Sequence, residues 1–287
     1  MADIRVDCVT LADGVSIRVA ESGDPSAPVV LLVHGWGASM YMWRDWFAPL
    51  AAAGRRAIAI DLPGHGMSDK PTDLGRYTLG ALVGVTRELI ERLRLGAPDV
   101  VAQSMGGTIA LELASRREGA IGRLVLVNPA CFGKVGALRL ARRASPRAVE
   151  PVLDRLVPRW VVARGHRMVY GDPSLITAAD IDQYWAPSQF PGYARAMRRL
   201  VHEFTWERPS VARTTAVLRS LVPPTASPLV VLGTRDRLVR DARPYVAALR
   251  AAGAPLEVFE SEGGGHAVNE ERPVEVLAVV RRFLGIA

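Results

Sequence analysis

Ser104 lies between a short apolar run and a helical run, in the stretch VVAQSMGGTIALEL (100–113). A strand that reverses into a helix within a residue or two forces the residue at the bend into an unfavourable backbone conformation, and small neighbours let strand and helix approach closely. Ala102, Gly106 and Gly107 are such neighbours. The pattern predicts a hydroxyl raised above a sheet edge at a helix N-terminus, where developing negative charge is favoured. A serine that only caps the helix fits the same letters.

Two further residues could activate this serine. A serine hydroxyl is a poor nucleophile at neutral pH and needs a base within hydrogen-bond reach, with a carboxylate that fixes the tautomer of the base. Among the five histidines, His266 follows a strand-like run in the glycine-rich segment 262–266, a flexible loop that could carry an imidazole over the sheet edge. Asp236 comes three residues after Gly233, which ends another strand-like run. We therefore predict a Ser104, His266, Asp236 triad, with a turn-capping aspartate as the alternative for Asp236.

The other four histidines are weaker candidates. His34 and His65 lie in glycine-containing turns after apolar runs, where structural hydrogen bonding is the favoured interpretation. His166 and His202 lie in an irregular middle region. For these two we favour satisfied surface histidines, and contact with a substrate stays open.

Acyl transfer also needs donors for the oxyanion of the tetrahedral intermediate, and each missing donor costs roughly 100- to 1000-fold in rate. The backbone N–H of Met105 directly follows the serine, and that of Trp36 follows the His34-Gly35 turn. We predict these two groups as the oxyanion hole. Two interpretations of the Trp36 ring remain open, a wall of the acyl pocket or an anchor of its loop.

The elements that must position these residues alternate along the chain. Two runs flank the turn 12–14 and predict a hairpin. Unbroken β-branched runs follow, which are typical of strands covered on both faces of a mostly parallel sheet. They are VVLLV (29–33), RAIAID (56–61), DVVAQ (99–103), RLVLVN (123–128), PLVVLG (228–233) and LEVFES (256–261). Together with the hairpin they predict about eight strands.

Helical patterns separate these runs. One helix face is predicted for Leu82, Val85, Leu89 and Leu93, and another for Val274, Leu277 and Leu284. Strand and helix alternation predicts an α/β fold. The alternation stops between about residues 130 and 227, where the chain becomes arginine-rich and then aromatic. We predict a core of residues 1–130 and 227–287, and a mainly helical cap, residues 131–226, over the carboxyl edge of the sheet.

From about residue 15 to its end the chain resembles the α/β-hydrolases that carry a cap domain. The resemblance rests on five segments in the family's order: VVLLVHGWG, AIDLPGHGMSDKP, VVAQSMGG, VVLGTRDRLV and GGGHAVNEERP. It implies the chain order nucleophile, acid, base. The sequence departs from the family at Ala102, where the elbow usually has glycine, and at Gln103, where many relatives have His or Trp. Asn128 and Pro129 occupy the family's alternative acid position, which leaves Asp236 as the acid.

The resemblance also bears on the reaction. Dehalogenases and epoxide hydrolases of this family use aspartate at the elbow, so Ser104 argues against both. It implies a serine hydrolase that cleaves an ester of a small to medium, largely apolar acyl or aryl substrate without a metal or organic cofactor. Alternatives are a carbon–carbon hydrolase of a vinylogous diketone, whose members share Ser-Met-Gly-Gly, or a lactone, amide or thioester hydrolase. A ligand-binding receptor on the same fold is the alternative without catalysis. The cap aromatics could line the pocket or form the core of the cap.

Composition bounds the remaining classes. A chain of 287 residues with 49% hydrophobic side chains can bury a sizeable core. Its positive charges, which give a net charge of +7, are almost all scattered arginines. We therefore predict a small-molecule substrate and neither a nucleic-acid nor a membrane partner. The densest basic segment, 139–147, is interpreted as a solvated helix face. Two distant cysteines and no long apolar run favour a cytoplasmic protein. The oligomeric state stays open.

Overall fold

One sheet organises the chain. The computed structural model describes residues 3–116, 121–145, 157–223, 225 and 227–286. These form an eight-stranded sheet in the order β1-β2-β4-β3-β5-β6-β7-β8, in which β1 pairs antiparallel with β2, β2 pairs antiparallel with β4, and the other pairs are parallel. The strands are β1 (Arg5–Thr10), β2 (Ser16–Ser22), β3 (Val29–Val33), β4 (Arg56–Ile60), β5 (Asp99–Gln103), β6 (Leu124–Val127), β7 (Leu229–Gly233) and β8 (Glu257–Ser261). The predicted hairpin and mostly parallel sheet are confirmed.

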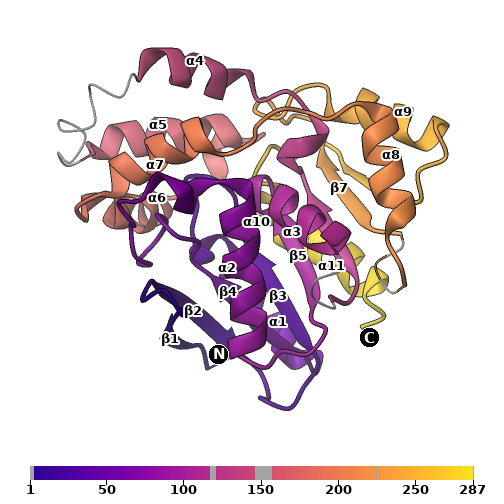
Figure 1. Ribbon diagram of the computed structural model, residues 1–287, viewed down its shortest axis with the longest axis horizontal. Helices are drawn as coiled ribbons and strands as arrows, with labels where there is room; N and C mark the ends of the chain where they lie inside the picture. Colours follow the sequence, from indigo (N-terminus) through magenta and orange to yellow (C-terminus); the bar gives the residue numbers. More distant parts are fainter. Residues whose placement is uncertain (1–2, 117–120, 146–156, 224, 226, 287) are drawn as a thin grey trace.

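Helices cover both faces of this sheet, which explains the unbroken apolar runs. Leu31, Val100 and Leu126 point into one apolar core, which also holds the buried faces of α2, α3, α8 and α9. Leu32 and Val101 point into the other core, beneath α1 and α11. The bounds of these helices are α1 (Phe47–Ala52), α2 (Leu79–Arg92), α3 (Met105–Arg116), α8 (Val211–Ser220), α9 (Ala242–Ala251) and α11 (Pro273–Phe283). In Figure 1, α2 and α3 lie across the central strands.

One predicted helix face needs correction. Leu277 and Leu284 are buried as expected, but Val274 is 84% exposed. The buried side of α11 is formed by Val276, Leu277 and Val280. At 3.6 residues per turn, Val274 lies almost opposite Val276, so it faces away from the sheet. By contrast, Leu82, Val85 and Leu89 of α2 are buried together as predicted, whereas Leu93 caps the end of the helix and is half-buried.

Between β6 and β7 the described residues form helices and no strand paired into the sheet. The helices are η3 (Ala130–Phe132), α4 (Gly136–Ala144), α5 (Arg159–Val169), η5 (Pro173–Leu175), α6 (Ala178–Trp185), η6 (Ala186–Gln189), α7 (Tyr193–Glu203) and α8. Helices α4 to α7 gather at the upper left of Figure 1, whereas α8 lies beside α9 and β7 at the right. Three short helices lie in the connections that follow β3, β4 and β8. They are η1 (Met40–Trp43), η2 (Leu74–Tyr77) and α10 (Val268–Glu271).

Two contacts place α5 and α7 over the carboxyl ends of the strands. The carbonyl of Val169, at the end of α5, accepts the His266 N–H after β8, at 2.7 Å. The carbonyl of Met197, in α7, accepts the Trp36 indole N–H after β3, at 3.1 Å. Helix α8 instead packs against α3 and α9 at the side of the sheet. The division into a core and a cap of residues 131–226 remains our proposal, and residues 146–156 of it lie outside the described part.

A buried ionic cluster joins α6 to the core. The Arg44 guanidinium, after η1, bonds the carboxylate of Glu270 in α10 and lies 3.0 Å from Asp180 Oδ1 in α6. Tyr184 of α6 donates its hydroxyl to Glu270 at 2.8 Å, and Tyr41 donates to Asp180 at 2.9 Å. Burial raises the pKa of Glu270, while Arg44 beside it acts in the opposite direction. Breaking such a pair by removing one partner typically costs about 3–5 kcal/mol.

His166 should make this region sensitive to acid. It stacks on Tyr184, with ring centroids 3.8 Å apart, and burial lowers its pKa to about 4. The unfolded chain takes up this proton below its ordinary pKa of about 6.5, whereas the folded chain does not, so the free energy of unfolding falls as pH drops from about 6.5 towards 4. The variant His166→Phe keeps the stacking but has no group to protonate. Between pH 7.5 and 5 we expect its free energy of unfolding to fall by about 1–2 kcal/mol less than that of wild type. Urea unfolding at both pH values measures this difference, and parallel losses would contradict it.

Candidate active site

Ser104 occupies the turn between β5 and α3 in a left-handed conformation, with φ +53°. Its N–H donates to Val127 O at 2.9 Å, and its carbonyl accepts the Ala130 N–H at 3.0 Å, so the bend is held from the neighbouring strand. A Cβ atom on Gly106 would lie 2.6 Å from His34 O, which explains the glycine there. Ala102 is fully buried in β5, so the usual elbow glycine is replaced without opening the turn.

The strained backbone of Ser104 should be measurable. A non-glycine residue in the left-handed region is disfavoured by about 1–2 kcal/mol, and glycine is not. Glycine loses more chain entropy on folding, but at a positive φ the strain of alanine outweighs that difference. We expect Ser104→Gly to be more stable than Ser104→Ala by about 1 kcal/mol, as measured by chemical denaturation. Equal stability of the two variants would show that the bend relaxes when the hydroxyl is removed.

The structure brings the three predicted triad residues together. His266 Nε2 lies 2.9 Å from Ser104 Oγ, and His266 Nδ1 lies 2.8 Å from Asp236 Oδ2. Ser104 is 5% exposed and His266 4% exposed. Asp236 is oriented through its other oxygen, because Oδ1 accepts the N–H groups of Leu238 at 2.8 Å and Val239 at 3.0 Å. With the Asp236 carboxylate accepting from Nδ1–H, Nε2 is left free to accept the Ser104 proton.

The segments that carry the two predicted oxyanion donors lie next to the serine. Met105 is the first residue of α3, and a Cβ atom on Gly35 would lie 2.9 Å from Ser104 Cβ, so the loop containing Trp36 packs directly against the bend. Among the described residues, neither the Trp36 nor the Met105 backbone N–H has a hydrogen-bond partner. Both groups are therefore available to a developing oxyanion, and their assignment to that role remains a proposal.

The Trp36 ring anchors its loop. Its indole N–H donates to Met197 O in α7, and its ring packs against the larger apolar core. His34, before it, accepts the Leu62 N–H at Nε2, at 3.0 Å, and its Nδ1 bonds Gly35 O at 2.7 Å. Because Nε2 accepts the Leu62 N–H, the ring is neutral, and burial lowers the pKa of His34 in the same direction. The structural interpretation of His34 is confirmed.

Two residues to which the sequence assigned no role, Gln103 and Asn128, bind the backbone at the base. Gln103 Nε2 donates to His266 O at 3.0 Å. Asn128 Nδ2 donates to both Gly265 O, at 3.0 Å, and His266 O, at 2.9 Å, while its Oδ1 accepts the Gly233 N–H. The sequence offered one indication of these roles. Gln103 directly precedes the nucleophile and Asn128 directly follows β6, so both lie at the carboxyl edge of the sheet, where the triad is.

The glycines before His266 serve close packing, which corrects the expectation of a flexible loop. A Cβ atom on Gly265 would lie 2.6 Å from Val169 O and 2.5 Å from the Tyr170 carbonyl carbon. A Cβ atom on Gly233 would lie 2.5 Å from Gly264 O. The loop is thus pressed between β7 and the segment after α5, where side chains have no room. Only glycine permits backbones to approach this closely.

The remaining histidines lie away from the triad. His65 stands edge-on to His34, with ring centroids 4.8 Å apart, and burial lowers its pKa well below the ordinary value. His166 stacks on Tyr184, and His202 lies at the exposed side of α7, where its Nε2 is 3.0 Å from Ser145 O. Neither contacts Ser104. Of the aromatics between residues 131 and 226, Trp185 bonds Val157 O within that region, whereas Phe204, with Trp206 tilted beside it, belongs to the larger apolar core that includes the sheet.

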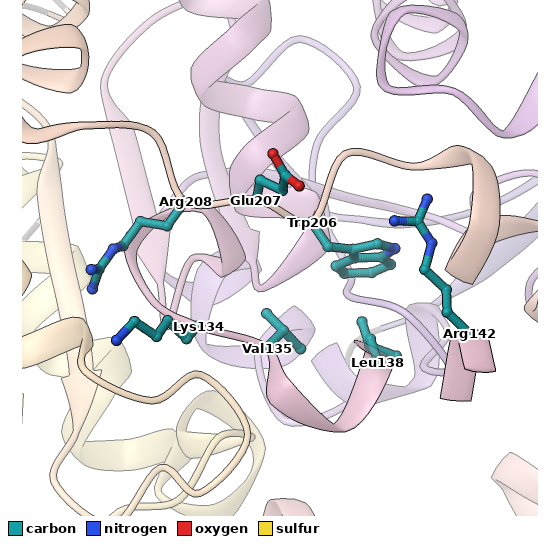
Figure 2. Close-up of a pocket in the computed structure, with 7 residues that line it drawn as sticks. All are labelled: Lys134, Val135, Leu138, Arg142, Trp206, Glu207 and Arg208. Atoms are coloured by element: carbon teal, nitrogen blue, oxygen red, sulfur yellow. The ribbon is translucent and has the colours of Figure 1, made fainter. Parts of the chain in front are cut away.

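A hollow of about 300 Å³ lies beside α4, and its lining includes none of the triad residues. Figure 2 shows its apolar floor and the cations around it; the lining residues are Lys134, Val135, Leu138, Arg142, Trp206, Glu207 and Arg208. Lys134 pairs with Asp241, Arg142 bonds His202 O, and Arg208 stacks over Tyr245. These three cations are thus engaged within the protein. Arg142 and Arg143 are exposed, as the interpretation of 139–147 as a solvated face expects; the side chains of residues 139, 140 and 144 and all of residues 146 and 147 lie outside the described part.

Neither a metal site nor a membrane span emerges from the described residues. No group of three or more His, Cys, Asp or Glu side chains among them could hold a metal ion. Within the same residues, no helix has the length and apolar character needed to cross a bilayer. The expectation of a cofactor-free reaction on a small molecule rests on the triad and stays a prediction.

Comparison with known proteins supports the architecture. The model of the alpha/beta hydrolase family matches residues 30–279. A haloalkane dehalogenase of Mycobacterium marinum is 33% identical over 242 residues, which cover 82% of this chain and 78% of that protein. Among solved structures, the epoxide hydrolase CorEH has a TM-score of 0.78 at 20% identity, over 99% of both chains. A variant of the meta-cleavage product hydrolase CumD has a TM-score of 0.74 at 20% identity, over 97% of both chains. At such identities the two structures show a shared fold.

Proposed function

Because this chain belongs to the alpha/beta hydrolase family and is a hydrolase of that fold, we propose that it is a serine hydrolase that cleaves an ester. The observation that carries the proposal is the 2.9 Å hydrogen bond between His266 Nε2 and Ser104 Oγ, with Asp236 on the opposite ring nitrogen. A hydroxyl bonded to a neutral imidazole, which a carboxylate orients, is the arrangement that makes serine nucleophilic.

The residues present suffice for both halves of the reaction. Ser104 Oγ attacks the ester carbonyl carbon while its proton moves to His266 Nε2, and the carbonyl oxygen becomes an oxyanion facing the Trp36 and Met105 N–H groups. His266 then gives the proton to the leaving alcohol as the C–O bond breaks. Water, deprotonated by the same nitrogen, attacks the acyl-enzyme and releases the acid, and Ser104 regains its proton. Asp236 keeps the imidazolium oriented in both halves.

The chemistry of serine favours a carbonyl substrate over a haloalkane or an epoxide. Attack by the Ser104 oxygen on a haloalkane carbon would expel halide and leave an alkyl ether on the enzyme. Opening an epoxide would also leave an ether. An ether has no carbonyl carbon for water to attack, so the enzyme would stop after one event, whereas an acyl-enzyme is an ester that water can hydrolyse.

The surroundings of Ser104 favour an apolar acyl or aryl group. The triad is nearly closed to water, with Ser104 5% and His266 4% exposed, and such a site disfavours strongly polar or charged acyl groups. A small to medium substrate fits a site whose nucleophile is 5% exposed. We therefore propose esters of modest acyl length as the substrate class, with a carbon–carbon bond in a vinylogous diketone, a lactone or a thioester as the competing classes.

A panel of substrates tests the proposal. Purified protein is assayed with p-nitrophenyl esters from acetate to palmitate beside a coloured ring-cleavage dienoate, a thioester, a haloalkane and an epoxide. We expect the short and medium esters to give the highest kcat/KM. Faster bleaching of the dienoate than cleavage of every ester would replace the ester proposal by carbon–carbon hydrolysis. Halide release or epoxide opening with turnover would contradict the role of Ser104 as the nucleophile.

A further inference from the structure

We propose that Glu271 is a positioning residue for His266. The Glu271 carboxylate fixes the backbone N–H of Gly265, the residue before the base, and joins it to the segment after α5. The inference rests on the proposed function, because it concerns the same base. Glu271 ends α10 and is 8% exposed. Its side chain does not touch Ser104, and its role follows from the backbone groups that converge on it.

Three backbone N–H groups bind this one carboxylate. Oε2 accepts Gly265 N–H at 2.7 Å and Gly171 N–H at 3.0 Å. Oε1 accepts Asp172 N–H at 2.9 Å. Gly265 is the residue before the base, and 171–172 follow α5, so the carboxylate connects two segments that are about 100 residues apart in sequence.

The three donors require an ionised carboxylate of this length. Hydrogen bonds from N–H groups to a charged acceptor are about twice as strong as neutral ones. A glutamine offers one oxygen and one NH₂ group, so at least one backbone N–H would face another donor. An aspartate is one methylene shorter and would not reach all three N–H groups. Gly171 and Gly265 also need the close approach, since a Cβ atom on Gly171 would lie 2.8 Å from Gly265 N.

This contact matters for the base because it acts on the adjoining peptide. His266 N–H donates to Val169 O, and the Gly265 and His266 carbonyls accept from Asn128. Glu271 supplies the remaining fixed point, at the Gly265 N–H. Without it, the Gly265 N–H is an unpaired buried donor, and among the described residues the two segments keep only their bonds to Val169 O. A displacement of about 1 Å at a catalytic group can cost about 100-fold in rate.

The neighbouring Glu270 provides a matched comparison. It is also buried, but its side chain binds Arg44, Tyr184 and Tyr170, and among the described residues no side-chain hydrogen bond joins it to the segment 262–266. Loss of either carboxylate disturbs the packing of the helical region on the core. Only the loss of Glu271 releases the peptide next to the base. The two effects can therefore be separated by comparing the two residues.

The test compares Glu271→Gln and Glu270→Gln in the full chain. The second-order rate of Ser104 labelling by a fluorophosphonate reports the nucleophile and base directly, and thermal unfolding reports stability. We expect Glu271→Gln to slow labelling about 10- to 100-fold, with an unchanged KM for any ester that wild type cleaves. Glu270→Gln should lower the unfolding temperature at least as much, because it removes the buried charge that Arg44 pairs with and leaves that guanidinium with Asp180 as its buried partner, and yet label within about threefold of wild type.

Several outcomes would overturn the inference. Labelling of folded Glu271→Gln at the wild-type rate would do so, as would equal slowing in both variants in proportion to lost stability. If Glu271→Gln does not fold, Glu271→Asp keeps the charge and should fold while labelling more slowly; a wild-type rate in that variant counts against the inference. The downfield proton resonance of the His266 Nδ1–H bond should weaken in either Glu271 variant. If wild type is not labelled, the proposed function falls first and takes the inference with it.

Discussion

Ser104→Ala is expected to abolish labelling by a fluorophosphonate and to lower ester turnover by about 10⁴- to 10⁶-fold, because triad members act as a unit. The hydroxyl is the only group of the serine that the mechanism uses. His266 Nε2, at 2.9 Å from it, would lose its proton donor and have no nucleophile to activate. His266→Ala should lower turnover by a similar factor, since removing the base leaves an inactive hydroxyl. Mass spectrometry of the labelled protein and initial rates measure both effects.

The control for this prediction is a second buried serine. Ser22 Oγ is buried and without a hydrogen-bond partner among the described residues, so Ser22→Ala removes a hydroxyl at little cost to stability. This variant should label and turn over like wild type. Labelling that persists in Ser104→Ala would place the nucleophile elsewhere, and a complete absence of labelling in wild type would favour a receptor on this fold.

Asp236→Asn is expected to lower kcat by about 10⁴-fold while leaving the fold in place, because it imposes the wrong tautomer on the base. Asp236 Oδ1 accepts two backbone N–H groups, from Leu238 and Val239. An asparagine keeps those bonds only if its oxygen takes that position, which turns its NH₂ group towards His266 Nδ1. That nitrogen must then accept, so the ring proton moves to Nε2, and Nε2 cannot take the proton of Ser104.

The same loop supplies a control for this substitution. Asp241 is half-exposed and pairs with Lys134 at 2.9 Å. Asp241→Asn removes a charge five residues along the chain without touching the base, and it should keep activity near wild type. Rates of ester cleavage and thermal unfolding of both variants give the comparison. Activity of Asp236→Asn within tenfold of wild type would mean that another group orients His266.

Much of the fold followed from local patterns. The runs 99–103 and 229–233 became β5 and β7 because β-branched side chains without alternation fit strands covered on both faces. The face of α2 followed from its 3.6-residue period. The prediction for Val274 was wrong, because the helical period shows which residues lie on the same side of a helix but not how wide the buried face is. The partners of α11 decide that.

The candidate site divides in the same way. Ser104, His266 and Asp236 were predictable from residue type, from position after strands and from chain order, because parallel strands deliver their carboxyl ends to one edge. The roles of Gln103, Asn128 and Glu271 were not. Each acts through backbone groups that are 6 to 163 residues away in the chain, and any polar side chain at these positions looks alike in sequence. The glycines at 263–265 suggested mobility, whereas packing uses them for close approach.

The sequence by itself determined which groups could do chemistry and which elements would carry them, because hydrophobic periodicity and turn chemistry are local properties. Only the tertiary structure decided how the base is held: the backbone of Gly265 and His266 is bound by β5, by the residue after β6, by α10 and by the end of α5. The hydrogen bonds of a buried backbone depend on which segments meet in space. Composition and residue spacing do not show which distant segments meet.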